Sequence, residues 1–285
     1  MTRPSRRLLL ATCASILAGV PALARPLDAA TASGDLRVAL YGDNAPFSVE
    51  VDGKPRGIDV EIAQGIADAL KLRLDLRLVD AGENVDGDFR LSLWKGDLAG
   101  TPLADLMLHV PHDRTLATRN EQIFLTTPYF DQHLVFAYRK GKLAGLETVA
   151  DLADHPVAVE GASASDMMLL TAENGRFRDN LRHYKSFDEA AKAYLAGEIP
   201  VLAGTRATIE AALFAAKASQ DDNPLAELAV PGMVKTHWEL GGAVRTDSRD
   251  LAYAVGDALT AMSESGRLKA ICASYGVTFV APKGY

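Results

Sequence analysis

The chain has 285 residues, 48% of them hydrophobic, which is enough for a sizeable core and favours two domains over one. With 37 acidic against 30 basic residues, its formal net charge of −7 argues against a nucleic-acid partner. Residues 1–24 predict a cleaved signal peptide, because a basic start and a moderately apolar run precede the small residues Ala22-Leu23-Ala24. The protein is therefore expected in the periplasm. Residues 5–10 also resemble a twin-arginine signal, so the export route stays open.

The part of the chain that follows this signal has one cysteine and no candidate membrane span. Cys272 alone lies beyond the cleavage site, so no intrachain disulfide is possible. No later stretch approaches the ~18 apolar residues that a membrane-spanning helix needs. Cleavage removes three arginines and no acidic residue, which brings the net charge to −10. The mature chain is predicted to be an acidic protein without a membrane span.

The first hundred residues predict a strand, a helix and a second strand. Residues 25–34 are expected to be a loose leader, and residues 36–40 form the first strand. A turn-rich segment follows, with a hairpin expected at Asp52-Gly53. Apolar residues then recur every four positions over residues 58–70, which predicts an amphipathic helix. Leucines alternate with charged residues over residues 72–78, which predicts a half-buried strand. This βαβ unit predicts a parallel sheet.

The middle of the chain contains the expected passage from one lobe to another. Residues 104–110 predict a buried strand, whereas residues 112–121 are polar and loop-like. The segment that begins at Arg119 ends on Pro128-Tyr129, and proline marks the end or the edge of a strand. A good strand follows at residues 134–140, so the chain is expected to cross to a second lobe. An arginine ahead of this crossing would lie near the mouth of an interlobe cleft, where ligands commonly bind.

The second half of the chain repeats the alternation of strands and helices. Ser186 and Glu189 form a capping box that opens a helix. Strands are expected at residues 157–159, 201–203, 228–230 and within 237–247, and helices at residues 187–195, 208–219, 248–265 and 268–275.

Four stretches stand in an order that is typical of one family. The first is the strand, the Pro-Phe turn and the helix start within residues 36–70, with Ile58 in place of the usual phenylalanine. The second is Arg119 with Pro128-Tyr129 nine and ten residues further on. The others are TVADLADHPVAVEGAS and GGAVRTD, the latter followed by paired helices. Over roughly residues 35–280 the chain thus resembles the family 3 solute-binding proteins, the periplasmic receptors of polar amino-acid ABC importers.

The resemblance implies an α/β protein with the two-lobed type II periplasmic binding protein fold, two crossover strands and an interlobe cleft. The crossovers would lie near residues 131–134 and 236–241. Residues 35–130 together with 241–285 would form the first lobe, and residues 134–235 the second. It also implies capture of a small anionic or amino-acid-like solute by hinge closure, with the permease of an ABC transporter as partner, and no enzymatic activity.

The resemblance also assigns candidate solute-binding residues. The family's arginine at the position of Arg119 clamps the ligand carboxylate, because a planar guanidinium bonds two oxygens at once; the alternative is a surface arginine that closes a loop. Ser163 begins a helix whose free N–H groups suit an anion, and an ordinary N-cap role is compatible with this. Two phenylalanines are expected either to stack on the solute or to lie in the core. The full set is Asp43, Asn44, Phe47, Phe89, Arg119, Ser163, Thr205 and Arg206.

Two positions depart from the family pattern. Thr205 stands where an aspartate usually holds the α-ammonium of the solute. The aspartate of the opening strand falls at Tyr41, although Asp43 is close. A buried ammonium without a carboxylate partner is costly, so these changes favour a dicarboxylate or another anion, held by Arg119 and Arg206.

A narrower resemblance gives an alternative function. The sequence Asn44-x-Pro46-Phe47-Ser48 and residues 105–111 and 113–119 look like a branch of solute-binding-like proteins associated with PQQ-dependent alcohol dehydrogenases. Proteins of that branch are periplasmic accessories. The chain would then be a non-transport protein whose partner is a periplasmic quinoprotein dehydrogenase.

Metal and enzyme interpretations are weaker. His109, His112, Asp113 and His133 are of metal-ligand types, but a strand-to-loop transition does not fix the first two imidazoles toward one ion. A few relatives of the fold are dehydratases or lytic transglycosylases, yet Glu160 is the one cleft-edge carboxylate that the sequence places. General acid–base catalysis needs a partner group at a matched distance. The sequence therefore predicts no metal site, no cofactor and no catalytic residue.

Overall fold

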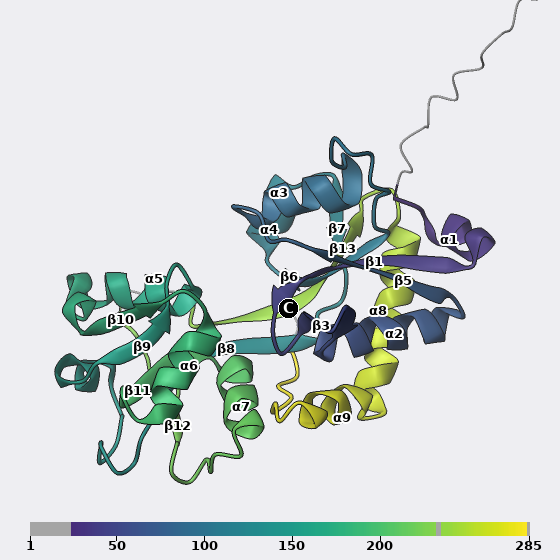
Figure 1. The fold of residues 1–285 in the computed structure, drawn as a ribbon. Helices are drawn as coiled ribbons and strands as arrows, with labels where there is room; N and C mark the ends of the chain where they lie inside the picture. Colours follow the sequence, from purple (N-terminus) through teal and green to yellow (C-terminus); the bar gives the residue numbers. More distant parts are fainter. Residues whose placement is uncertain (1–23, 232–234, 284–285) are drawn as a thin grey trace, which may run out of the picture.

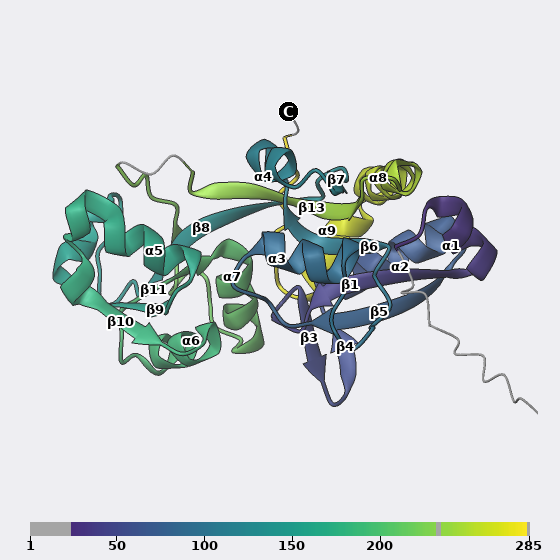
Figure 2. The same cartoon turned by 90° about the horizontal axis from the view of Figure 1, so that it is seen from above.

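The computed structural model describes residues 24–231 and 235–283, so the predicted signal peptide lies, except for Ala24, outside the described residues. Two groups of helices and strands are joined by the long strands β8 (Phe130–Tyr138) and β13 (His237–Arg245) (Figure 1; Figure 2). One continuous sheet runs through both groups in the order β10-β9-β11-β8-β13-β6-β1-β5. This mixed sheet with helices around it confirms the predicted α/β class.

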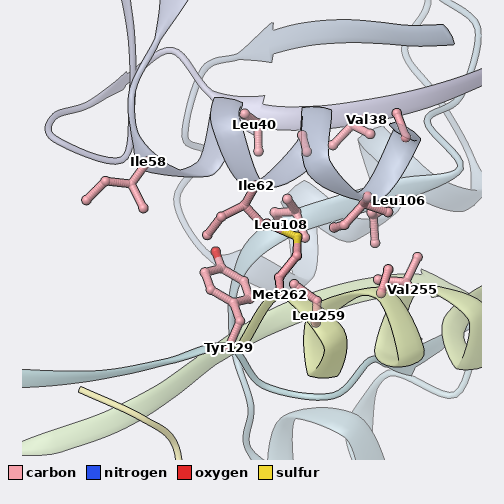
Figure 3. Packing of buried hydrophobic residues seen from close by; sticks show 14 of the residues in the cluster. Val38, Leu40, Ile58, Ile62, Leu106, Leu108, Tyr129, Val255, Leu259 and Met262 are labelled. Carbon is pink, nitrogen blue, oxygen red and sulfur yellow. The ribbon is translucent and has the colours of Figure 1, made fainter. Parts of the chain in front are cut away.

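The first lobe is built on the βαβ unit that the sequence predicted. β1 (Asp35–Tyr41) pairs in parallel with both β5 (Arg73–Val79) and β6 (Leu106–Pro111). Along the chain, β1 and β5 are connected through α2 (Ile58–Leu70). Its residues Ile58, Ile62 and Ile66 are fully or almost fully buried. The four-residue spacing turns these side chains toward one face, and Figure 3 shows Ile62 between the strand residues Leu40 and Leu108 and the opposite helix. Burial of this face holds the helix on the sheet.

The shorter elements of the first lobe lie around this unit. The predicted hairpin is confirmed, because β3 and β4 pair across Asp52-Gly53. α3 continues directly into a π-helical turn, so the structure has a short mixed helix in this region. The bounds are α1 (Leu27–Ser33), β2 (Asp43–Asn44), β3 (Ser48–Val51), β4 (Lys54–Arg56), α3 (Val85–Phe89), the π turn Arg90–Trp94, α4 (Arg114–Arg119) and β7 (Ile123–Leu125).

The second lobe repeats the parallel arrangement. β9 pairs in parallel with β10 and β11, and β11 joins β8 in the antiparallel sense. The predicted cap of α6 is present, since the hydroxyl of Ser186 accepts a hydrogen bond from Glu189 N at 3.3 Å. The bounds are β9 (Val157–Glu160), α5 (Ala164–Thr171), β10 (Leu181–Tyr184), α6 (Phe187–Ala196), β11 (Val201–Thr205), α7 (Arg206–Ala215) and β12 (Leu225–Ala226), with 3-10 turns at Val149–Asp154, Ala172–Gly175 and Arg178–Asn180.

The C-terminal helices pack on the first lobe. In Figure 3, Leu259 and Met262 of α8 (Arg249–Glu264) lie against Ile62 of α2. α9 (Arg267–Ser274) follows and also contacts α2. The segment after α9 then returns to the second lobe, where Thr278 N donates to Glu210 Oε2 at 2.7 Å. The C-terminal tail is thus a third connection between the lobes, beside the two crossover strands.

Three local predictions differ from the structure. The leader that was expected to be loose contains α1, and the polar stretch that was expected to be a loop contains α4. α4 begins where the side chain of Asp113 accepts from Leu116 N at 2.9 Å, a cap that needs no long apolar pattern. The strand expected at residues 228–230 is absent, and the short strand β12 just before it pairs with β8. Among the described residues, no helix combines the length and the apolar character that crossing a membrane would need.

Candidate functional site

The carboxyl ends of parallel strands in the two lobes lie across from each other. Asp43 follows the end of β1 in the first lobe, and Glu160 is the last residue of β9 in the second. Burial raises the pKa of Glu160, and the negative charge of Asp43 raises it further, so Asp43 of the first lobe acts on Glu160 of the second. Ligands of open α/β sheets bind outside such carboxyl ends. These ends therefore define the candidate site.

Glu160 has the most informative electrostatics of this site. Burial raises its pKa first, the carboxylates of Asp43 and Asp188 raise it further, and a hydrogen bond from the N–H of Phe187 lowers it. A carboxylate that is partly desolvated beside two others is costly in its charged form. A cationic group placed among the three would remove this cost. The site thus favours an ammonium at this position.

Glu160 ends the strand next to the one that ends at Thr205. β9 and β11 are neighbours, with Val157 opposite Val201 and Ala158 opposite Leu202. Continued by two residues, this register sets Glu160 beside Gly204, one residue from Thr205. Thr205 itself caps α7, because its hydroxyl accepts from Thr208 N at 3.2 Å. The second lobe therefore has an acidic group at the expected level, on the adjacent strand.

The two candidate arginines lie in different lobes and already have carboxylate neighbours. Arg119 Nε donates to both oxygens of Asp86 at 3.1 and 3.0 Å, and 53% of its side chain is exposed. No described residue bonds to its two terminal amino groups, so these remain for a solute. Arg206 Nη1 lies 3.6 Å from Glu210 Oε1, and its Nη2 lies 3.5 Å from Glu227 Oε2. Joint binding of one anion by these two guanidinium groups stays a prediction.

Ser163 is the N-cap of α5, which is one of the two roles predicted for it from the sequence. Its hydroxyl accepts from Asp166 N at 3.2 Å. The carboxylate of Asp166 lies at the same helix end, where Oδ2 accepts from Ala162 N and Oδ1 lies 2.8 Å from His183 Nε2. An acidic side chain at this terminus opposes a second anion. Binding of a solute anion by Ser163 stays a prediction.

The two candidate phenylalanines lie in the core. Phe47 and Phe89 have no exposed surface. The ring of Phe47 lies 4.5 Å from the ring of His109 and 5.5 Å from that of Phe130, measured between centroids. In this conformation neither phenylalanine offers a ring face to a solute. The Nδ2 of the neighbouring Asn44 is also buried, and it has no hydrogen-bond partner among the described residues.

A buried cluster next to the site was not found from the sequence. The fully buried Asp59 accepts from Tyr129 Oη and pairs with His109 Nδ1, both at 2.7 Å. His109 lies near the end of β6 with φ of 62°, in the left-handed region that few non-glycine residues adopt. Burial and the charge of Asp59 raise the pKa of Tyr129 well above its ordinary value. An aspartate in the first turn of an apolar helix was the available sequence signal.

The comparisons with known proteins agree with this arrangement. No family model matches the chain. The L-cystine-binding protein TcyJ of Escherichia coli (strain K12) is 27% identical over 239 residues, which cover 84% of this chain and 81% of the relative. Among solved structures, an ancestral cationic amino-acid solute-binding protein (AncCDT-1) is similar with a TM-score of 0.69 and 20% identity, covering 87% of this chain and 98% of its own. An amino-acid ABC transporter substrate-binding protein from Streptococcus pneumoniae, bound to L-arginine, has a TM-score of 0.61, 22% identity and coverage of 89% and 99%.

The two lobes on crossover strands have the fold of type II periplasmic binding proteins. The resemblance predicted from the sequence is confirmed as well. The chain is similar in sequence to a solute-binding protein, and in fold to binding proteins of amino-acid ABC importers. The proteins named above are binding proteins, and they give no support to the alternative of an accessory to a PQQ-dependent dehydrogenase.

Proposed function

We propose that this protein captures an amino acid whose ammonium group binds between Asp43 and Glu160, for delivery to an ABC importer. The observation that carries the proposal is the place of Glu160 at the carboxyl end of β9, where burial and the charge of Asp43 raise its pKa. Repulsion between these carboxylates opposes closure of the lobes without a solute. A bound ammonium reverses the sign of that interaction, so the solute itself would stabilise the closed state.

The proposal changes the expected solute class. The sequence favoured an anion because Thr205 leaves the ammonium without a partner, but Glu160 on the adjacent strand can replace it. The relative TcyJ is named for L-cystine and one structural neighbour holds L-arginine, and both solutes carry ammonium groups. The solute carboxylate would bind the terminal amino groups of Arg119.

The remaining assignments follow the family pattern. Residues 35–130 with 241–285 would move as the first lobe and residues 134–235 as the second. We infer that residues 1–24 direct export to the periplasm and are removed near Ala24. The partner is the permease of the importer. We also infer binding without turnover, since the relatives are named as binding proteins.

Titration calorimetry at pH 7 with L-cystine, L-arginine and a dicarboxylate tests the solute class. The variant Glu160→Gln should bind the two amino acids at least tenfold more weakly, because loss of a charged partner costs ~2–5 kcal/mol of affinity. Glu198→Gln changes an exposed carboxylate of the same lobe and should bind like the wild type. Tighter binding of the dicarboxylate than of either amino acid, improved further by Glu160→Gln, would contradict the proposal.

A further inference from the structure

Histidine and aspartate side chains gather where the two crossover strands run side by side. β8 and β13 are antiparallel, and their register sets His237 directly opposite His133. Asp131 precedes His133 by two residues on β8, so both side chains point to the same face of the sheet. One ligand atom of each of the three residues lies within 4.8 Å of the other two.

The centre of the cluster is a carboxylate with almost no access to water. Asp131 is 1% exposed. Its Oδ1 lies 3.0 Å from His237 Nδ1, and its Oδ2 lies 3.1 Å from His133 Nε2. A buried carboxylate needs partners that supply positive charge or hydrogen bonds. Of the two imidazoles, His237 supplies a hydrogen bond through Nδ1, at 3.0 Å from Asp131 Oδ1.

The proton on His133 is placed by a second carboxylate. His133 Nδ1 lies 2.8 Å from Glu227 Oε1, and a carboxylate accepts, so Nδ1–H donates to it. In the neutral ring Nε2 then carries a lone pair, which faces the lone pairs of Asp131. This Nε2 is buried and lies 3.1 Å from Asp131 Oδ2, yet the contact does not have the geometry of a hydrogen bond. A carboxylate behind one histidine nitrogen and a free lone pair on the other is the usual arrangement of a metal-binding histidine.

We propose that Asp131, His133 and His237 bind a zinc ion that links the two crossover strands. Two imidazoles and one carboxylate are ligands that Zn²⁺ prefers, with the fourth position left to water, whereas Mg²⁺ and Ca²⁺ prefer oxygen ligands. Zinc–nitrogen bonds of about 2.0–2.1 Å require the three groups to draw closer together. His237 can make this movement, since 45% of its side chain is exposed.

The ion also has a path to the site. A cavity of about 460 Å³ is lined by Asp131 and His237, together with Trp238 and Lys235. The sequence analysis predicted no metal site, because it grouped His133 only with His109, His112 and Asp113. The structure instead joins His133 to a residue of the other crossover strand, a pairing that only the register of β8 and β13 creates.

A zinc ion at this position would act on the hinge. Asp131 and His133 belong to β8 and His237 to β13, the two strands through which the lobes are joined. Bonds to one ion would hold these strands in a fixed relation and limit their bending. Any change that zinc makes in solute affinity must be matched by an equal effect of the solute on zinc affinity.

Zinc binding to the purified, chelator-treated protein tests the proposal. Calorimetry and native mass spectrometry should show one Zn²⁺ per chain, with no binding of Mg²⁺. His133→Gln and His237→Gln should each weaken Zn²⁺ binding at least tenfold. His183→Gln is the matched control, because His183 pairs with the single carboxylate of Asp166 at 2.8 Å and has no second imidazole, so this variant should bind zinc like the wild type.

Circular dichroism of each variant establishes that it is folded before titration. Should His133→Gln fail to fold, the half-exposed His237 still decides the question. Binding of less than one Zn²⁺ per chain at concentrations that saturate ordinary zinc sites would overturn the proposal. It would mean that Asp131 and Glu227 hold His133 only as an imidazolium. Equal zinc affinity of wild type and His237→Gln would also overturn it.

Discussion

Tyr129 ties the start of α2 to the end of β6 through a single hydroxyl. Its Oη donates to Asp59 at 2.7 Å and accepts from His109 N at 3.1 Å. Because Asp59 is fully buried, loss of this donor leaves a desolvated carboxylate with one partner fewer. Tyr129→Phe should therefore lower the free energy of unfolding by about 1–3 kcal/mol. Urea denaturation measures it, with Tyr253→Phe as the exposed control, and equal stability of the two variants would show that the hydroxyl contributes nothing.

Arg119 is the residue whose proposed role depends most on the family pattern. If its terminal amino groups bind the solute carboxylate, Arg119→Ala should lose at least tenfold in affinity and fold normally. Lysine should restore only part of the loss, because an ammonium cannot form the two-pronged contact. Arg176→Ala is the control, since Arg176 is 52% exposed and also pairs with one carboxylate. Unchanged affinity in Arg119→Ala would leave Arg119 as a surface residue paired with Asp86.

Glu160 makes solute binding depend on pH. Its folded-state pKa is raised, so the side chain becomes neutral at a higher pH than an ordinary glutamate. Affinity for an ammonium-bearing solute should therefore fall as the pH drops through that raised pKa. Glu160→Gln should show a flatter pH profile over the same range. An identical pH dependence in both proteins, measured by calorimetry, would separate Glu160 from the solute.

The same shift affects stability. The folded state without solute holds the Glu160 proton more tightly than the unfolded state, so the side chain lowers stability as the pH rises above 4.5, its ordinary pKa. Glu160→Gln removes this penalty. The variant should gain stability relative to the wild type between pH 4 and pH 7 in thermal denaturation. A loss of relative stability over that interval would mean that Glu160 is favourably paired in the free protein.

Among the elements, α2 begins at a closely packed turn. Gly57 precedes it with φ of 131°, and a Cβ there would lie 2.2 Å from the carbonyl oxygen of Phe47. Gly57→Ala should thus destabilise through both backbone strain and collision. Gly34→Ala is the control, because a Cβ at Gly34 meets nothing within 4 Å, and the cost is strain alone, ~1–2 kcal/mol. Equal unfolding free energies for the two variants would contradict the close packing of this turn.

The sequence predicted the long periodic helices, but it missed the short helices α1 and α4. Over α2 the apolar residues repeat often enough to specify which face is buried. α4 has six residues and one buried side chain, so its boundaries come from the cap at Asp113 and not from a pattern. Its existence depends on a local hydrogen bond that sequence statistics do not resolve.

The candidate site was predicted only in part. The sequence analysis placed Asp43 near the site and Glu160 at the cleft edge. It did not predict that the charge of Asp43 raises the pKa of Glu160, because the two residues are far apart in the sequence. For Phe47 the sequence could not distinguish stacking on a solute from burial in the core, because both roles require an aromatic ring. Only the packing of Phe47 against His109 separates the two.

The whole molecule consists of two lobes joined by β8, β13 and the C-terminal tail. Bending of these connections would bring Asp43 and Glu160 around a solute, and movement about such hinges is a common mode of closure. Small-angle X-ray scattering is the most direct test, comparing the free protein with the protein saturated by the amino acid that binds most tightly in calorimetry. The account predicts a smaller radius of gyration with the solute. An unchanged radius at proven saturation would contradict capture by closure of the lobes.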